Sequence, residues 1–236
     1  MSNKPAAGPE QGPPVRDAAT VILLRHATDG RPQVLMGQRG ARAVFMPSKF
    51  VFPGGALDPE DAGLAEALVI DPLTERRLAA RADPALARPL ALAAIRELFE
   101  ETGLALGLPD PAAPGLAARA PSTLRPMLEA GLLPDARGLA FVFRAVTPPG
   151  RPRRFDARFF LADAGRLHGD AEDFGRACGE LSALAWIDLA EARRLELPFI
   201  TEVVLSEVEA ILAAGSATRP VPFFHHDAAG SHVSLV

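Results

Sequence analysis

The fold of this 236-residue chain is decided by one stretch, Arg96-Glu97-Leu98-Phe99-Glu100-Glu101-Thr102-Gly103-Leu104. On a helical wheel with about 100° per residue, Glu100 lies about 60° to one side of Glu97 and Glu101 about 40° to the other. The apolar side chains fall on the opposite side of the wheel. The stretch therefore predicts an amphipathic helix from about Leu90 to Thr102, which ends at Gly103, a residue type that commonly caps helices.

The three carboxylates of this helix face have few basic neighbours. A solvated acidic face usually carries Lys or Arg three or four residues away, whereas Glu97 meets Glu100 and Glu101 at those spacings and only Arg96 can pair with Glu100. Such like charges are mildly unfavourable unless a cation lies among them, and hard divalent ions such as Mg²⁺ prefer carboxylate oxygens. The spacing leaves two interpretations open, a solvated acidic face and a metal site.

A glycine pair precedes the helix in the segment Phe52-Pro53-Gly54-Gly55. Adjacent glycines permit backbone conformations that other residues avoid, and they let a carbonyl or amide group approach a ligand closely. A simple tight turn is the alternative interpretation. Only the combination with the acidic helix favours a role in a site.

Together these pieces resemble the Nudix box, Gly-x5-Glu-x7-Arg-Glu-U-x-Glu-Glu-x-Gly-U, in which U is a bulky aliphatic residue. The second half of the box matches in full, from Arg96 to Leu104. In the first half, the acidic position is Asp61 when counted from Gly55 and Glu60 when counted from Gly54. Between Asp61 and Arg96 lie 34 residues where the family has seven, which makes an insertion of 27 residues.

Two further segments, Phe45–Gly55 and Pro152–Phe160, resemble the insertion-containing subgroup that includes peroxisomal coenzyme A diphosphatases. The likeness covers roughly residues 18–212. It implies an α/β fold, a Nudix-type α/β/α sandwich with a mixed sheet and a helical insertion inside the box. It also implies hydrolysis of a diphosphate linked to another moiety, with Mg²⁺ or Mn²⁺ as the cofactor.

The resemblance also implies roles for individual residues. The metal ligands would be Glu97, Glu100 and Glu101, with the carbonyl of Gly54 and the carboxylate of Asp61 as additions. Glu97 is the first candidate for the general base, and Arg96 would orient a glutamate through a charge-assisted hydrogen bond.

A basic run, Arg151-Pro152-Arg153-Arg154, leads into a predicted strand over Phe155–Leu161. On a strand, Arg154 and Arg158 share one face and could bind substrate phosphates, and Arg39 is a similar candidate. The alternative is a solvated strand edge protected by charge.

The favoured function is hydrolysis of coenzyme A or acyl-coenzyme A. The same machinery would also suit ADP-ribose, NADH or a nucleotide sugar, and a catalytically silent sensor of a nucleotide metabolite is the alternative from another class. The expected partner is a small nucleotide-type molecule, and a homodimer is a candidate assembly. A net charge of −4 argues against a general nucleic-acid binder, and the apolar stretches are too short to span a bilayer. With no targeting signal recognised, we expect a cytoplasmic protein.

The chain divides into a disordered lead over 1–17, a Nudix domain over 18–214 and a tail over 215–236 that is unstructured or docks. Within the domain, an insertion over about 62–89 reads as helical with breaks at Pro72 and Pro84. The insertion is expected either to wall the substrate pocket or only to pack on the outside. Further elements are predicted at Ala19–Leu24, Val34–Met36, Phe50–Phe52, Leu139–Val146, Leu184–Ile187 and, as a helix, Ile200–Ala213, with proline-rich loops over 109–126.

Overall fold

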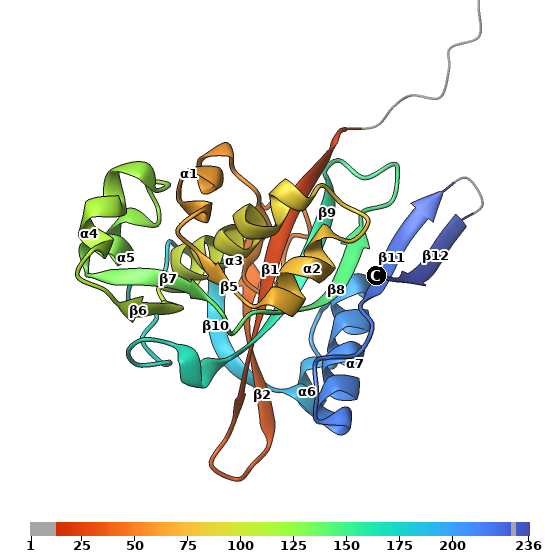
Figure 1. The fold of residues 1–236 in the computed structure, drawn as a ribbon. Coiled ribbons are helices and arrows are strands. Elements are labelled where there is room, and N and C mark those ends of the chain that lie inside the picture. Colours follow the sequence, from red (N-terminus) through yellow and green to blue (C-terminus); the bar gives the residue numbers. More distant parts are fainter. Residues whose placement is uncertain (1–12, 228–229) are drawn as a thin grey trace, which may run out of the picture.

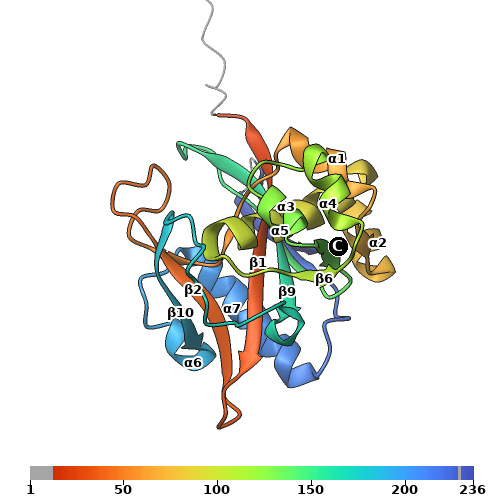
Figure 2. The same ribbon diagram turned by 90° about the vertical axis from the view of Figure 1, so that its left-hand side faces the viewer.

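The computed structural model describes residues 13–227 and 230–236. Within them, nine strands form one mixed sheet (Figure 1). The sheet has the order β10 (Leu181–Asp188), β2 (Pro32–Arg39), β1 (Val15–His26), β9 (Arg154–Asp163), β8 (Ala140–Val146), β11 (Pro222–Asp227) and β12 (Gly230–Leu235), with β3 (Phe50–Val51) beside β2 and β4 (Gly54–Ala56) beside β1. Figure 2 shows β10, β2, β1 and β9 in succession.

Helices cover both faces of this sheet, because the side chains of a strand alternate between its two faces. Val21 of β1 belongs to the core under α3 (Ala87–Thr102), whereas its neighbour Ile22 packs with α7 (Phe199–Ala214). Figure 1 shows α3 lying across β1. The predicted α/β/α sandwich with a mixed sheet is confirmed.

Helix α3 forms as the sequence predicts, although it begins at Ala87 and not at Leu90. Its last turn ends at Gly103, which has a φ of 79° and donates its backbone N–H to the carbonyl of Phe99 at 2.8 Å. This left-handed conformation strains residues that carry a Cβ, so glycine is suited to the position.

The remaining elements are smaller and lie mostly beside α3. The short strands β5 (Val69–Ile70), β7 (Leu132–Ala136) and β6 (Gly107–Pro109) form a second sheet. The short helices are α1 (Ala62–Ala65), α2 (Pro72–Ala79), α4 (Ala113–Leu116), α5 (Arg125–Glu129) and α6 (Leu189–Ala192), and single 3-10 turns are η1 (Pro59–Asp61), η2 (Pro84–Leu86), η3 (Ala117–Arg119) and η4 (Ala164–Arg166).

Three sequence predictions differ from these elements. The lead expected over 1–17 ends earlier, because β1 starts at Val15 and pairs with β9 from there; residues 1–12 lie outside the described part. The proline-rich region 109–126 contains α4 and η3, since proline is well tolerated in the first turn of a helix. For the tail, the unstructured alternative is wrong and the docking alternative is observed, because β11 and β12 form a hairpin on the edge of the sheet beside β8.

The sheet changes partners along β1, and this change positions the site. The second half of β1 pairs with β2 through Leu24 and Val34, whereas its first half pairs with β4 through Thr20 and Gly54. Strands β2 and β4 therefore occupy the same edge of β1 at different heights. The glycine turn between Val51 and Gly54 enters the sheet at this changeover, next to the acidic face of α3.

Candidate active site

The three glutamates of α3 differ in burial and partners. Glu101 is 2% exposed, and its Oε2 accepts a hydrogen bond from the backbone N–H of Gly54 at 2.8 Å. The side chains of Glu97 and Glu100 are 14% and 29% exposed. One carboxylate is therefore held inside the protein by the glycine turn, and two lie nearer the surface.

Arg96 is the basic side chain that contacts Glu97 and Glu100. Its side chain is 3% exposed and donates to Glu97 Oε1 at 2.8 Å and to the carbonyl of Ala56 at 3.0 Å. Its Nη1 lies 3.6 Å from Glu100 Oε2. The predicted hydrogen bond between Arg96 and a glutamate is present, and the burial of Arg96 fits the positioning role expected for it.

The position of Asp61 contradicts the role of metal ligand expected for it. Asp61 is fully buried and accepts two hydrogen bonds from Arg96, at 2.8 and 3.0 Å, and one from the backbone N–H of Asp58 at 2.9 Å. These bonds occupy both carboxylate oxygens. Asp61 therefore fixes Arg96, and Glu60, its neighbour, lines the cleft described below.

The glycine pair is required by close packing and not by an unusual backbone conformation. Neither Gly54 nor Gly55 has a positive φ. A Cβ on Gly55 would lie 2.4 Å from Glu97 Oε1, and a Cβ on Gly54 would lie 2.5 Å from the carbonyl oxygen of Ala19. The missing side chains give the Glu97 carboxylate its space.

Burial raises the pKa of two of these carboxyl groups above the ordinary value. It raises the pKa of Glu97 to about 7 against the opposing effect of Arg96, and it raises the pKa of Glu101 to about 8 against the opposing hydrogen bond from Gly54. The charge of Glu180, which lies outside α3, adds to both shifts. A cation among these carboxylates would remove this electrostatic penalty.

The glutamates line one end of a cleft of about 1300 Å³. Its walls come from β1, from the segment before β4, from β9 and from the first turn of α7. No residue of the insertion over 62–89 lines it, so the expectation that the insertion walls the pocket is wrong. Two of its arginines are held by protein groups: Arg77 donates to the carbonyls of residues 217–219, and Arg88 pairs with Glu75 within the insertion itself.

The face of β9 that lines the cleft is not the predicted face, which carries Arg154 and Arg158. Arg153, Phe155 and Ala157 line the cleft, which places Arg154 and Arg158 on the opposite face. Arg158 is 2% exposed and forms ion pairs with Asp17 and Asp156, and the Nε of Arg154 donates to the carbonyl of Thr147 at 3.2 Å. The structure therefore contradicts both as substrate-binding residues.

Arg39 lies at the cleft as expected, together with Glu180, an acidic residue outside the Nudix-like motif. Arg39 Nη2 donates to Glu180 Oε1 at 2.9 Å, and both residues line the cleft. Glu180 reaches the site because the preceding loop packs on α3, where the N–H of Cys178 donates to the carbonyl of Glu100 at 2.9 Å. No spacing within the Nudix-like motif signals this contact, since it joins segments about 80 residues apart in the chain.

The C-terminal hairpin also lines the cleft. Phe224, His226 and Ser231 line it, opposite Phe199 and Ile200 of α7. The rings of Phe199 and Phe224 lie 5.9 Å apart. Phe199, Ile200 and Phe224 give this part of the cleft apolar side chains, next to the polar side chains of His226 and Ser231.

Comparisons with known proteins agree with this geometry. No sequence model of a protein family matches the chain. The crystal structure of a NUDIX hydrolase from Alicyclobacillus acidocaldarius is 30% identical, covers 87% of this chain and 99% of its own, and superposes with a TM-score of 0.63. This chain belongs to the Nudix hydrolase family. A Caenorhabditis elegans protein that bears the name nudix hydrolase 7 is 30% identical in an alignment 188 positions long. The match covers 75% of this chain and 52% of that curated relative, so the chain spans about half of the relative's length.

The donor set of this Nudix domain suits a divalent cation, although its carboxylates do not converge on one point. Within residues 13–227 and 230–236, no three Asp, Glu, His or Cys side chains are close enough together to hold an ion. Mg²⁺, however, is commonly held by one or two carboxylates together with water and substrate phosphates. Buried Glu101 has one hydrogen-bond donor and no ion pair in the described part of the chain, so it can accept such an ion.

The raised pKa values predict how the stability of the metal-free Nudix domain depends on pH. Glu97 and Glu101 hold protons more tightly in the folded chain, with pKa values of about 7 and 8, than carboxyls with the ordinary value of 4.5 in the unfolded chain. Their contribution to the free energy of unfolding therefore decreases as the pH rises from about 4.5 to about 8.

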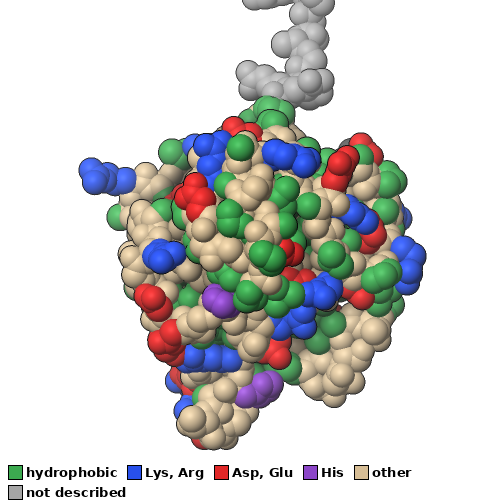
Figure 3. Space-filling view, turned by 60° about the vertical axis from the view of Figure 1, so that its left-hand side comes forward, with side chains coloured by type: hydrophobic (Ala, Val, Ile, Leu, Met, Phe, Trp, Pro, Cys, Tyr) green, Lys and Arg blue, Asp and Glu red, His purple; other side chains and the backbone are tan. Residues whose placement is uncertain are grey.

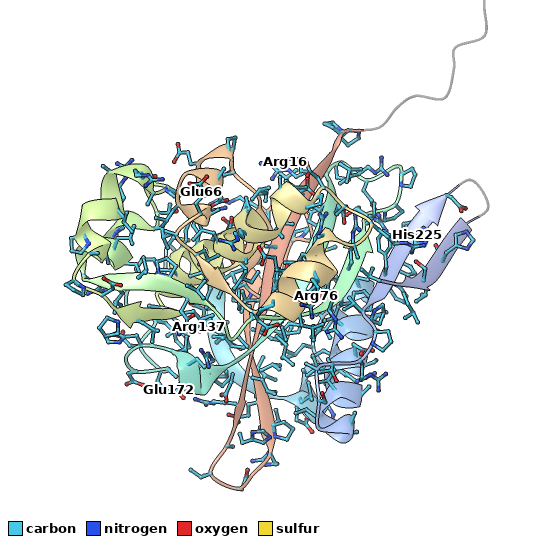
Figure 4. The ribbon with its side chains drawn as sticks, viewed as in Figure 1. Arg16, Glu66, Arg76, Arg137, Glu172 and His225 are labelled. Carbon is cyan, nitrogen blue, oxygen red and sulfur yellow. The ribbon has the colours of Figure 1, made fainter. Side chains whose placement is uncertain are left out.

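Urea unfolding in EDTA between pH 5 and pH 8.5 measures this decrease. We expect Glu101→Gln to flatten the decrease relative to the wild type, because the amide has no proton to lose. Glu66 is exposed and is labelled in Figure 4, and the stability of Glu66→Gln should show the same pH dependence as that of the wild type. Parallel curves for wild type and Glu101→Gln would contradict the burial of an ionisable Glu101.

Proposed function

We propose that this chain is a divalent-metal-dependent hydrolase that cleaves the diphosphate bond of a nucleoside diphosphate-linked substrate. The observation that carries the proposal is the buried carboxylate of Glu101, which has no ion pair among the described residues and lines a large cleft together with Glu97 and Glu100. When bound, Mg²⁺ or Mn²⁺ would offset the charge of the diphosphate and lower the pKa of water. The 30% identity with the NUDIX hydrolase from Alicyclobacillus acidocaldarius supports a hydrolase activity.

The residues of the chain divide the work in this proposal. Glu97, Glu100 and Glu101 hold the metal, with the Gly54 carbonyl as a further oxygen donor. Glu97 is the candidate general base, because Arg96 fixes its carboxylate at the edge of the cleft. Arg39, at the cleft wall, would contact the diphosphate through its guanidinium group.

Coenzyme A or acyl-coenzyme A is the substrate that we favour. The two segments that resemble the coenzyme A diphosphatases lie on the cleft, at residues 45–55 and at 152–159. The aromatic side chains that line the cleft, among them Phe155, Phe199 and Phe224, would suit a pantetheine arm or an acyl chain. ADP-ribose, NADH and nucleotide sugars are the alternatives with the same diphosphate chemistry.

A product-release panel over coenzyme A, acyl-coenzyme A, ADP-ribose, NADH and a nucleotide sugar tests the proposal in Mg²⁺ and in Mn²⁺. We expect the highest kcat/KM for coenzyme A or its thioester, and no turnover in EDTA. Turnover of ADP-ribose or NADH alone would transfer the assignment to that substrate. Binding without turnover of any compound would favour a catalytically silent sensor.

The remaining partner and location predictions stay predictions. None of the described helices is long and apolar enough to cross a membrane. Figure 3 shows one face of the molecule, on which cationic, anionic and apolar side chains are mixed and no basic surface dominates. A homodimer and a cytoplasmic location are still proposals.

A further inference from the structure

A second hollow, of about 640 Å³, lies beside the cleft and is rich in arginine. It is lined by the segment 39–44, by Arg153 and by Glu180. Arg39, Val44, Arg153 and Glu180 also line the main cleft, so the two hollows are continuous. We call the second hollow the arginine pocket.

The arginine pocket carries excess positive charge. Arg39 is paired with Glu180 at 2.9 Å and is also fixed by its hydrogen bond to the carbonyl of Phe45 at 3.1 Å. In the described part of the chain, neither Arg42 nor Arg153 forms an ion pair, and both are exposed. The Glu180 carboxylate is matched by Arg39, which leaves two cationic groups without a counter-charge.

The pocket adjoins the carboxylates that would hold the metal. Arg39 and Glu180 are close enough to Glu101 for their charges to alter its pKa. A diphosphate placed over the glutamates would therefore lie next to the pocket entrance. An arginine guanidinium group donates two parallel hydrogen bonds that match phosphate oxygens. The guanidinium groups of Arg42 and Arg153 would therefore suit a doubly charged phosphate.

We propose that the arginine pocket binds a phosphomonoester that the substrate carries in addition to the diphosphate bond that is cleaved. This inference rests on the proposed function and narrows its substrate class to nucleotides with an extra phosphate on the ribose. Arg42 and Arg153 are the specificity-determining residues of the pocket. Arg42 lies in the loop between β2 and β3, and Arg153 directly before β9, so the sequence separates the two by 111 positions.

Matched substrate pairs test the proposal in the full chain. We compare kcat/KM for coenzyme A with that for 3′-dephospho-coenzyme A, and for NADP⁺ with that for NAD⁺, in the wild type, Arg42→Gln and Arg153→Gln. A preference within the coenzyme A pair would indicate that the pocket binds a 3′-phosphate, and a preference within the NADP⁺ pair would indicate a 2′-phosphate. Arg76→Gln is the control, because Arg76 is exposed on α2, away from the cleft (Figure 4).

We expect the wild type to prefer the phosphorylated member of one pair by about tenfold or more, the size of a hydrogen bond to a charged group. Each pocket variant should lose most of that preference through a higher KM for the phosphorylated member, and Arg76→Gln should keep it. Equal kcat/KM within both pairs in the wild type would overturn the proposal. A preference that both variants retain would also overturn it, because the phosphate would then be bound elsewhere.

A binding measurement separates this proposal from the proposed function. Calorimetry with adenosine 3′,5′-bisphosphate, adenosine 2′,5′-bisphosphate and AMP in EDTA requires no turnover. Tighter binding of a bisphosphate than of AMP, lost in Arg42→Gln, supports the pocket even if no diphosphate is hydrolysed. Hydrolysis without any preference for an extra phosphate leaves the proposed function intact and removes the pocket.

Discussion

Glu101→Gln is expected to lower kcat by about 100-fold or more, while the metal-free protein unfolds at a higher temperature than the wild type. The loss follows from the removal of a proposed metal ligand. The gain follows because Glu101 is buried with no ion pair in the described part of the chain, and its ionised form is disfavoured there. Glu100→Gln should lose activity to a similar extent with an unchanged Tm, because Glu100 is more exposed and lies near Arg96.

Steady-state turnover over a range of Mg²⁺ concentrations, together with thermal unfolding in EDTA, measures both effects. Glu66→Gln is the matched control, since Glu66 is an exposed glutamate outside the cleft. Added Mg²⁺ should raise the Tm of the wild type more at pH 8 than at pH 6, because protons compete with the ion for the carboxylates. Wild-type turnover of both glutamate variants at limiting metal would remove the metal site from α3.

Asp61→Asn is expected to destabilise the protein by about 3 kcal/mol, because it removes one partner of a buried ion pair. Asp61 accepts two hydrogen bonds from Arg96 and one from Asp58. The amide group of Asn would place a donor against the guanidinium or against the backbone N–H. Activity should also decrease, because Arg96 fixes Glu97.

Denaturant unfolding in EDTA checks the loss, and Glu60→Gln is the matched neighbour. Glu60 lines the cleft, so its substitution should leave the stability unchanged. If Glu60 is a metal ligand, Glu60→Gln will require more Mg²⁺ for half-maximal activity. An Asp61→Asn variant with wild-type stability and weakened metal binding would show that Asp61 is a ligand and that its ion pair is incidental.

The sequence alone was sufficient to predict helix α3 and the glycine that ends it. A period of 3.6 residues separates the carboxylates of α3 from its apolar face, and Gly103 ends the helix where a left-handed residue is needed. Both signals are local, because they depend on residues within a few turns of one another. The glycine pair is also visible in the sequence, but the reason for it is not local, because it leaves space for Glu97, a residue far from it along the chain.

Tertiary structure decided which side chains reach the cleft. The period of two on β9 defines two faces, but only the pairing of β9 with β1 and the position of α7 make the face of Arg153 the cleft face and bury Arg158. The spacing of the motif likewise predicted Asp61 as a metal ligand, but its contact with Arg96 depends on how the folded chain packs.

The same physical limit explains the contributions of Glu180 and of the C-terminal hairpin. Glu180 reaches the site through a loop that packs on α3, and the hairpin reaches the cleft by pairing with β8. Neither contact has a local signal, since both depend on how distant segments meet after the chain has folded. The sequence by itself determined the chemistry available on α3; the assembled sheet determined what surrounds it, because contacts between distant segments depend on the packing of the whole domain.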